Sequence, residues 1–208
     1  LLPLVNPEGF YMGAKQTIPA DGQNLNRMFP GDPAGTFSSR FAKILEKVLY
    51  PEADFLMDLH GGDINEALTP LIFFPAAVPD TLAAKTSAAA AALSVPYRVA
   101  STSKNGLYSW AAQCGIPSLL VERGERGLWS ENEITACKRN VFELMDHLKI
   151  KTFSNTAFHQ EEIRQSIYEE APINGFWYPA VSHAGQKLKQ GALLGTLKDF
   201  YGNEIFRY

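Results

Sequence analysis

Short, mostly apolar runs alternate with helical segments through much of this chain. Residues 53–60, 69–75 and 116–122 are such runs, and they are typical of strands that are buried on both faces. Before the first of them, residues 36–50 carry apolar side chains at the spacing of an amphipathic helix. Because strands buried on both faces need helices beside them, this alternation predicts an α/β fold with a mostly parallel mixed sheet flanked by helices.

Capping and turn signals predict the remaining elements. Asp80 and Ser130 are suitable N-caps for two helices, and Gly115 would end a third. Residues 8–35 are rich in Gly, Pro, Asn and Asp, which predicts a long ordered loop, and such loops are usually functional. Further helices are expected at residues 80–94, 107–114 and 130–148, and further strands at residues 1–5 and 97–100.

The composition changes near residue 151. Residues 151–156 are polar and predict a linker, and the rest of the chain has the pattern of short strands with frequent turns. The run from Gly185 to Gly195 resembles the glycine-bounded hairpin of small barrel-sandwich modules. We therefore predict a first domain at residues 1–150 and a small β-rich, barrel-sandwich-like module at residues 151–208.

Charge and hydropathy exclude several classes of protein. With 208 residues, 46% hydrophobic content and a net charge of -3, the chain fits a globular protein without a nucleic-acid-binding face. No apolar run reaches the roughly 18 residues that a membrane span needs. Cys114 and Cys137 make no disulfide framework, so we expect both to be buried apolar residues in a reducing, cytoplasmic setting.

Polar residues stand where apolar strands end, and these are the candidate functional residues. His60 ends one strand, and Asp58 lies on the same face of it, where a carboxylate can orient an imidazole that binds metal. Glu122 ends another strand, and Asn26 and Arg27 lie in the long loop. Ligands of parallel sheets bind beyond the carboxyl ends of the strands, so these residues predict a single active site.

Each candidate also has a structural interpretation. His60 could be a hydrogen-bonded core histidine, and Arg27 could form a surface salt bridge. Glu122 could cap a helix or pair with Arg123 or Arg126. The planar guanidinium of Arg27 nevertheless suits a carboxylate ligand, which it can bind through two hydrogen bonds.

Four motifs follow one another along the chain: Asn6-Pro7-x-Gly9, Asp21-Gly22-x-Asn24-Leu25-Asn26-Arg27-x-Phe29-Pro30-Gly31, Asp58-Leu59-His60 and Val121-Glu122-x-Gly124. In order and spacing they resemble the succinylglutamate desuccinylase/aspartoacylase family, the deacylase branch of the zinc carboxypeptidase-like hydrolases. The resemblance implies a zinc-hydrolase catalytic domain at residues 1–150, followed by the β-rich module.

The resemblance also implies a zinc site that is incomplete in this chain. The family holds Zn²⁺ by a His-x-x-Glu pair and by a later histidine, which His60 matches. His159 and Glu162 have the spacing of the pair, but they follow His60, so we interpret them as a coincidence. The chain lacks an initiator Met, and we expect the pair upstream of Leu1, with the front of the catalytic domain and part of the C-terminal module also missing.

For the remaining residues the resemblance implies roles in amide hydrolysis. Glu122 matches the general base, and Asn26 and Arg27 match the pair that binds the substrate's carboxylate. The family often has a further arginine upstream of this pair, but here the nearest cation is Lys15.

These roles predict a zinc-dependent amidohydrolase that removes an acyl group from an N-acyl amino acid or related small amide. The alternatives are a carboxypeptidase-like peptidase and a metal-free binding protein on the same fold. The expected partner is a small N-acyl amino acid or short peptide, with neither nucleic acid nor membrane, and a homo-oligomer is compatible with the sequence. We expect the 208 residues alone to be inactive, because they supply only one convincing ligand of the three that a hydrolytic zinc site takes.

Overall fold

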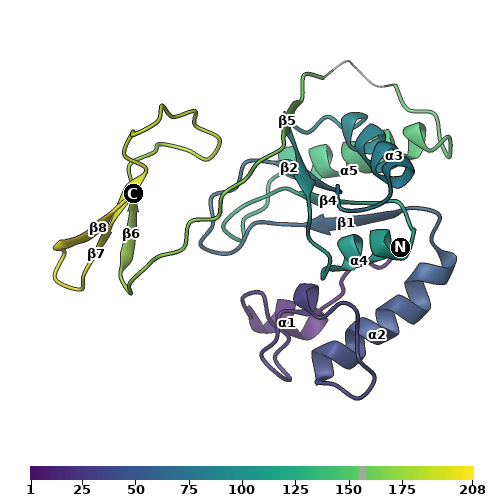
Figure 1. Cartoon of the computed structure of the whole chain (residues 1–208), viewed down its shortest axis with the longest axis horizontal. Coiled ribbons are helices and arrows are strands. Elements are labelled where there is room, and N and C mark those ends of the chain that lie inside the picture. The colour runs from purple at the N-terminus through teal and green to yellow at the C-terminus, as the bar shows by residue number, and fades with distance from the viewer. Residues whose placement is uncertain (155–157) are drawn as a thin grey trace.

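The computed structural model describes residues 1–154 and 158–208, and its strands form two separate sheets (Figure 1). One sheet has five strands in the order β1-β4-β2-β3-β5, and the other has three in the order β6-β7-β8. Part of the predicted linker at residues 151–156 lies outside the described residues.

The five-stranded sheet is mixed and mostly parallel, as the sequence predicts. β1 (Leu56–His60) is parallel to β4 (Ser118–Glu122), and β3 (Tyr97–Ser101) is parallel to both β2 (Leu71–Pro75) and β5 (Glu161–Ile163). The two parallel sets are joined by β2 and β4, which pair antiparallel.

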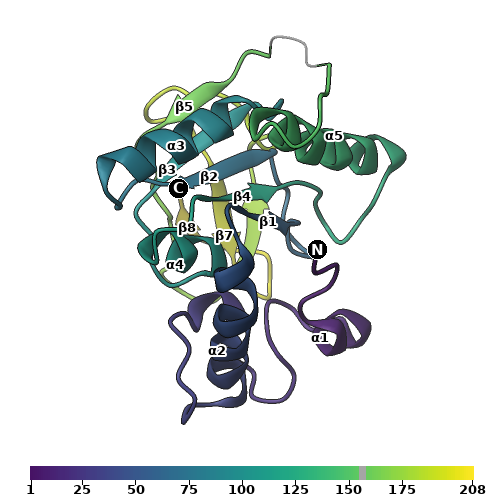
Figure 2. The same cartoon turned by 90° about the vertical axis from the view of Figure 1, so that its right-hand side faces the viewer.

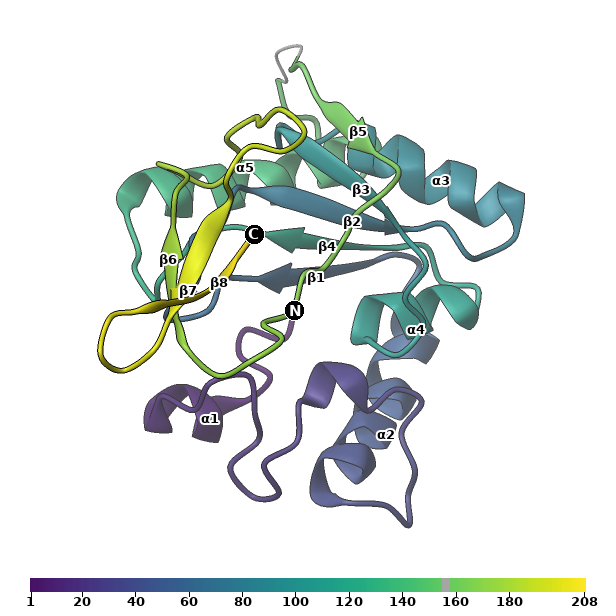
Figure 3. The same cartoon turned by 60° about the vertical axis from the view of Figure 1, so that its left-hand side comes forward.

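Helices lie on both faces of this sheet. α3 (Asp80–Ala91) and α5 (Glu131–His147) cover one face, and α4 (Leu107–Gln113) packs on the other. Past the β1 edge of the sheet lie α2 (Phe37–Leu49) and α1 (Pro7–Met12), as Figures 2 and 3 show from two sides. The sequence therefore predicts the layers of the fold correctly.

Alternation along the strands divides the core into two layers. Leu119 and Val121 of β4 are almost fully buried, in the cluster that contains residues of α3 and α5. Leu120, with Leu56 of β1, packs instead against Tyr108 of α4. Burying a side chain of this size contributes roughly 1.5–3 kcal/mol, so the alternation fixes which face each strand residue takes.

Two predicted features of the N-terminal region are wrong. Residues 1–5 form no strand, and Leu1, Leu2 and Leu4 are exposed. An isolated strand has no partner for its backbone groups, and Pro3 removes one of the donors. The predicted loop at residues 8–35 contains α1, whose first turn is capped by the side chain of Asn6.

The three-stranded sheet is antiparallel and consists of β6 (Phe176–Pro179), β7 (Gly195–Lys198) and β8 (Glu204–Arg207). The small β-rich part of the fold prediction is thereby confirmed. The run between Gly185 and Gly195, however, forms no hairpin of strands, because β7 begins only at Gly195.

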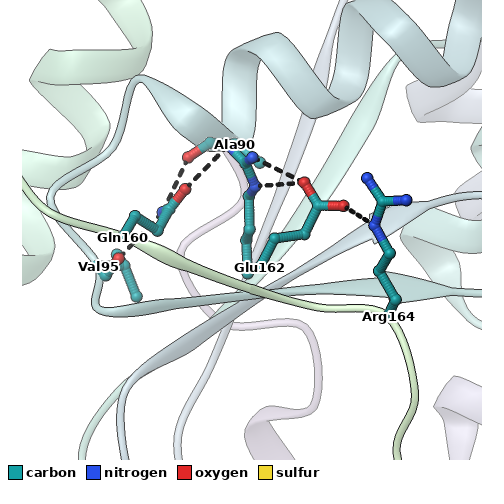
Figure 4. A network of polar contacts seen from close by, with 6 residues as sticks. Ala90, Val95, Gln160, Glu162 and Arg164 are labelled. Atoms are coloured by element: carbon teal, nitrogen blue, oxygen red, sulfur yellow. Dashed lines mark hydrogen bonds and ion pairs between the residues drawn. The ribbon is translucent and has the colours of Figure 1, made fainter.

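β5 lies beyond residue 150 and yet belongs to the first sheet. Gln160 donates through Nε2 to the carbonyls of Ala90, Leu93 and Val95, at 3.0–3.4 Å. Arg98 of β3 binds the Glu162 carboxylate at 2.7 Å. Figure 4 shows the side chains of Gln160 and Glu162 that make these contacts. These bonds hold the start of the C-terminal segment on the sheet edge. The carboxylate of Glu162 is engaged in an ion pair with Arg98 that joins β5 to β3.

The cysteines differ from expectation. Cys114 is exposed, because α4 ends at Gln113 and Gly115 turns the chain with φ 87°. Cys137 is half-buried on α5. Among the helices of the described residues, none has the length and apolar character that crossing a membrane would require.

Candidate active site

The pairing of β1 with β4 places His60 directly opposite Glu122. Both residues end their strands, and the amide of Arg123 donates to the carbonyl of His60 at 3.0 Å. By alternation His60 and Glu122 share a face with Leu56 and Leu120, which is the face that α4 covers. The two sequence candidates at the strand ends are thus brought together.

Asp58 orients the His60 imidazole, since its Oδ1 lies 3.2 Å from His60 Nε2. Burial would lower the pKa of His60, but the hydrogen bond and charge of Asp58, with the charge of Glu122, raise that pKa above its ordinary value. Asp58 Oδ2 is buried and accepts no hydrogen bond from the described residues. Because the carboxylate holds Nε2, it leaves Nδ1 of His60 for another ligand.

Glu122 is a carboxyl group whose pKa lies above its ordinary value. Burial is the largest cause, and the negative charges of Glu66 and Asp58 act in the same direction. His60 and Arg27 oppose the shift without cancelling it. A raised pKa suits a carboxylate that must accept a proton and later release it.

Asn26 and Arg27 belong to the 3-10 helix η1 (Leu25–Arg27), which begins after the side-chain cap of Asn24. Asn26 Oδ1 accepts from the amide of Leu107 at 2.8 Å, so this side chain holds the start of α4. The guanidinium of Arg27 is exposed and donates to the carbonyl of Asn26 at 2.9 Å. Arg27 also acts electrostatically on both His60 and Glu122, whereas a role for Asn26 toward substrate stays a prediction.

Gly106 is required where η1 meets α4, because a Cβ there would lie 2.6 Å from Asn26 Oδ1. We expect Gly106→Ala to displace Asn26, to destabilise the protein by about 1–3 kcal/mol and to raise KM. Thermal unfolding and steady-state kinetics would measure both effects. In an Asn26→Ala background the same substitution should cost much less, and equal costs in both backgrounds would contradict this contact.

A cavity of about 770 Å³ lies over these residues and joins all the candidates. His60, Glu122, Asn26 and Arg27 line it, together with several residues that sequence reasoning missed. The missed lining residues include Gln16, Asp63, Glu66, Ser101, Ser103, Tyr108 and Tyr168.

Tyr108 is the most buried of the missed polar residues. Burial is the main reason that its pKa is raised to about 12, so its hydroxyl stays protonated and able to donate. On sequence alone it has the spacing of a core position of α4, and it does pack in that core. A local signal is Gly106, which comes two residues before Tyr108 and lies close to Asn26.

The family often has a further arginine upstream of Asn26 and Arg27, and in this chain the nearest cation to that place is Lys15. Lys15 forms an ion pair with Asp63 at 3.4 Å. Asp63 Oδ2 accepts no geometrically sound hydrogen bond from the described residues, so this contact is an ion pair only. Lys15 is about half exposed and does not line the cavity, which leaves Arg27 as the only Arg or Lys among the described lining residues.

The described residues offer a suitable type of zinc ligand, but too few ligands for a complete zinc site. An imidazole oriented by a carboxylate is a common zinc ligand, and His60 provides one. Within residues 1–154 and 158–208, no group of three or more His, Cys, Asp or Glu side chains is placed to hold a metal ion. A hydrolytic zinc site takes three protein ligands, so His60 would need ligands from elsewhere.

A family comparison agrees with the fold. Residues 1–148 match the model of the succinylglutamate desuccinylase/aspartoacylase catalytic domain. The chain therefore belongs to this family of deacylating hydrolases, and the resemblance seen in the four sequence motifs is confirmed.

Relatives of known structure share the whole fold of the chain. A succinylglutamate desuccinylase/aspartoacylase from Rhodobacter sphaeroides is 27% identical, with a TM-score of 0.84 over 99% of this chain and 65% of that one. The product-bound ectoine utilization protein EutE (DoeB) from Ruegeria pomeroyi, 23% identical, has a TM-score of 0.85 over 100% and 64%. This second likeness concerns the fold alone.

A curated relative matches over a shorter segment. The N-alpha-acetyl-L-2,4-diaminobutyric acid deacetylase of Halomonas elongata is 42% identical over 62 residues, which are 30% of this chain and 18% of that protein. The chain thus spans less than two thirds of the length of each of these three relatives.

Proposed function

We propose that this chain is part of a zinc-dependent amidohydrolase that removes an acyl group from an N-acyl amino acid. The observation that carries the proposal is the pairing of β1 with β4, which presents His60 and Glu122 side by side to one cavity. The family of the chain agrees with a deacylase, and the exposed Arg27 beside these residues agrees with a substrate that carries a carboxylate.

Each residue has a task that its surroundings support. Arg27 binds the substrate's carboxylate, and the neutral hydroxyl of Tyr108 donates a hydrogen bond within the cavity. Glu122 takes a proton from water and passes it to the leaving amine, as its raised pKa favours. His60 would hold zinc together with ligands outside the described residues, and bound zinc lowers the pKa of water and polarises a carbonyl.

The charge of the cavity favours a substrate that also carries a cation. Among the carboxylates that line it, Asp58 is bound to His60, Asp63 is paired with Lys15 and Glu122 is the proposed base. This leaves Glu66 for a substrate cation, while Arg27 binds the carboxylate. A substrate with one carboxylate and one ammonium group fits this balance better than an N-acyl dicarboxylate does. The name of the Halomonas relative, a deacetylase of an N-acetylated diamino acid, agrees with this substrate class.

A substrate comparison tests the proposed function. The zinc-loaded protein that contains this chain would be assayed with N-acetyl-2,4-diaminobutyrate, N-acetyl-aspartate and a dipeptide with a free carboxyl end. We expect the highest kcat/KM for the first. Preference for the dipeptide would favour the peptidase alternative, and protein that binds no zinc and hydrolyses none of the three would favour the binding protein.

Four further properties belong to the proposal. We expect the 208 residues alone to be inactive with added zinc, because the described residues offer His60 without a complete ligand set. The protein is expected to be cytoplasmic, with a small molecule as its partner and a homo-oligomeric state still compatible. Full activity and stoichiometric zinc in the isolated 208 residues would contradict the first expectation.

Arg27→Lys keeps the positive charge but loses the planar fork that binds a carboxylate through two hydrogen bonds. We expect KM to rise by about tenfold, which corresponds to ~1.4 kcal/mol, while the unfolding temperature stays unchanged. Steady-state kinetics and thermal unfolding would measure both. Arg40→Lys, another exposed arginine, is the matched control. An unchanged KM for Arg27→Lys would place the carboxylate elsewhere.

A further inference from the structure

A buried polar network lies on the face of the sheet opposite to the cavity. Arg123 Nε donates to Glu133 Oε2 at 3.1 Å, and its Nη1 donates to Asn140 Oδ1 at 3.5 Å. Asn140 Nδ2 donates to Glu143 Oε2 at 2.9 Å, and the amide of Ser94 donates to the same oxygen at 2.7 Å. Arg123 is thereby tied to α5, and α5 is tied to the turn that follows α3.

The backbone of Arg123 lies directly beside His60 and Glu122. It directly follows Glu122, and its amide donates to the carbonyl of His60 at 3.0 Å. A second bond runs from the amide of Gly62 to the carbonyl of Gly124 at 2.8 Å. These two backbone bonds extend the pairing of β1 with β4 just beyond the strand ends, so the backbone of Arg123 is part of the pairing that holds His60 beside Glu122.

Polar burial of this extent is costly and gives a reason to look for a role beyond stability. Asn140 and Glu143 are 0% and 1% exposed, and Glu143 Oε1 is buried without a hydrogen-bond partner among the described residues. Apolar side chains at such positions would often give equal or greater stability. Directional hydrogen bonds instead hold one geometry, and here they hold the end of β4.

We propose that Arg123 is a positioning residue, anchored by Asn140 and Glu133, which holds Glu122 and His60 in their working geometry. The proposal rests on the proposed function for its catalytic meaning, but its geometric part stands on the two backbone bonds. The side chain of Arg123 bonds to α5 and is not among the residues that line the cavity.

The first test needs no activity and uses the protein that contains this chain. In Arg123→Gln, amide hydrogen exchange at residue 123 and Gly62 should become about tenfold faster or more, because local opening there loses its side-chain anchor. Exchange at Val121, inside β4, should stay unchanged. Arg126→Gln, which removes an exposed arginine of the same loop, should change none of these rates. Unchanged exchange at residue 123 and Gly62 would overturn the proposal.

The second test measures turnover in the zinc-loaded protein that contains this chain. Arg123→Gln should lower kcat by about tenfold to a hundredfold with KM and zinc content nearly unchanged, since small misplacements of reacting groups have effects of this size. Glu133→Gln should lower kcat less, and the double variant should be no worse than Arg123→Gln alone. Additive losses, or a normal kcat despite faster exchange, would refute the positioning role.

The two tests separate this proposal from the proposed function. If the protein hydrolyses no N-acyl amino acid, the proposed function fails, while the exchange rates still decide whether Arg123 holds the strand ends. If Glu122→Gln abolishes turnover but Arg123→Gln does not change it, the proposed function stands and the positioning role is wrong.

Discussion

Glu122→Gln should lower kcat by about a hundredfold or more, because it removes the proton acceptor while it preserves the shape of the side chain. The structure favours this large effect, since Glu122 is a partly buried carboxyl group with a raised pKa that faces the cavity beside His60. Steady-state kinetics of the zinc-loaded protein would measure the loss, and zinc content should stay normal.

The control for this prediction is Glu131→Gln, which neutralises an exposed carboxylate at the start of α5 and should leave kcat unchanged. Near-normal turnover in Glu122→Gln would show that another group is the base. Glu66 would then be the next carboxylate to test, because it also lines the cavity.

His60→Ala should cause the second large effect, the loss of bound zinc together with activity. The imidazole is held by Asp58 and is the only histidine side chain among the described residues that line the cavity. Metal analysis after dialysis would measure zinc per protein. Asp58→Asn should lower zinc affinity by about 10–100-fold, as the loss of an orienting partner of a metal-bound histidine typically does.

His159→Ala is the matched control, because His159 has Glu162 three residues later and therefore has the spacing of a zinc-binding pair. His159 is exposed and Glu162 is bound to Arg98, so zinc content should not change. Normal zinc stoichiometry in His60→Ala, or its loss in His159→Ala, would show that the metal lies elsewhere.

Local patterns in the sequence predict much of the catalytic unit. Periodicity gives α2, α3, α4 and α5 and the strands of the five-stranded sheet up to β4, with ends displaced by a few residues. His60 and Glu122 are the polar residues that end two of the apolar runs. These features are encoded locally, because the period of apolar side chains and the identity of a strand's last residue need no knowledge of the neighbours.

Prediction from local sequence patterns fails where the structure of a segment depends on a neighbouring strand. Residues 1–5 are apolar enough for a strand but pair with no strand among the described residues. β5 is polar, yet it pairs with β3, and side-chain bonds of Glu162 and of the preceding Gln160 hold it at the sheet edge. Composition near residue 151 carries no information on that pairing, because β5 joins the sheet through side chains that contact residues more than 60 positions away.

The sequence by itself determined the class of the fold, the strand ends that carry His60 and Glu122, and the family to which the motifs point. Only the tertiary structure decided that β1 lies next to β4 and that Asn26 accepts a hydrogen bond from Leu107, 81 positions later, at the start of α4. It also decided that Arg123 bonds to Asn140 of α5, on the face of the sheet opposite to the cavity. The physical reason is that strand order, register and side-chain bonds between distant segments depend on how whole layers pack, and no local periodicity records that arrangement.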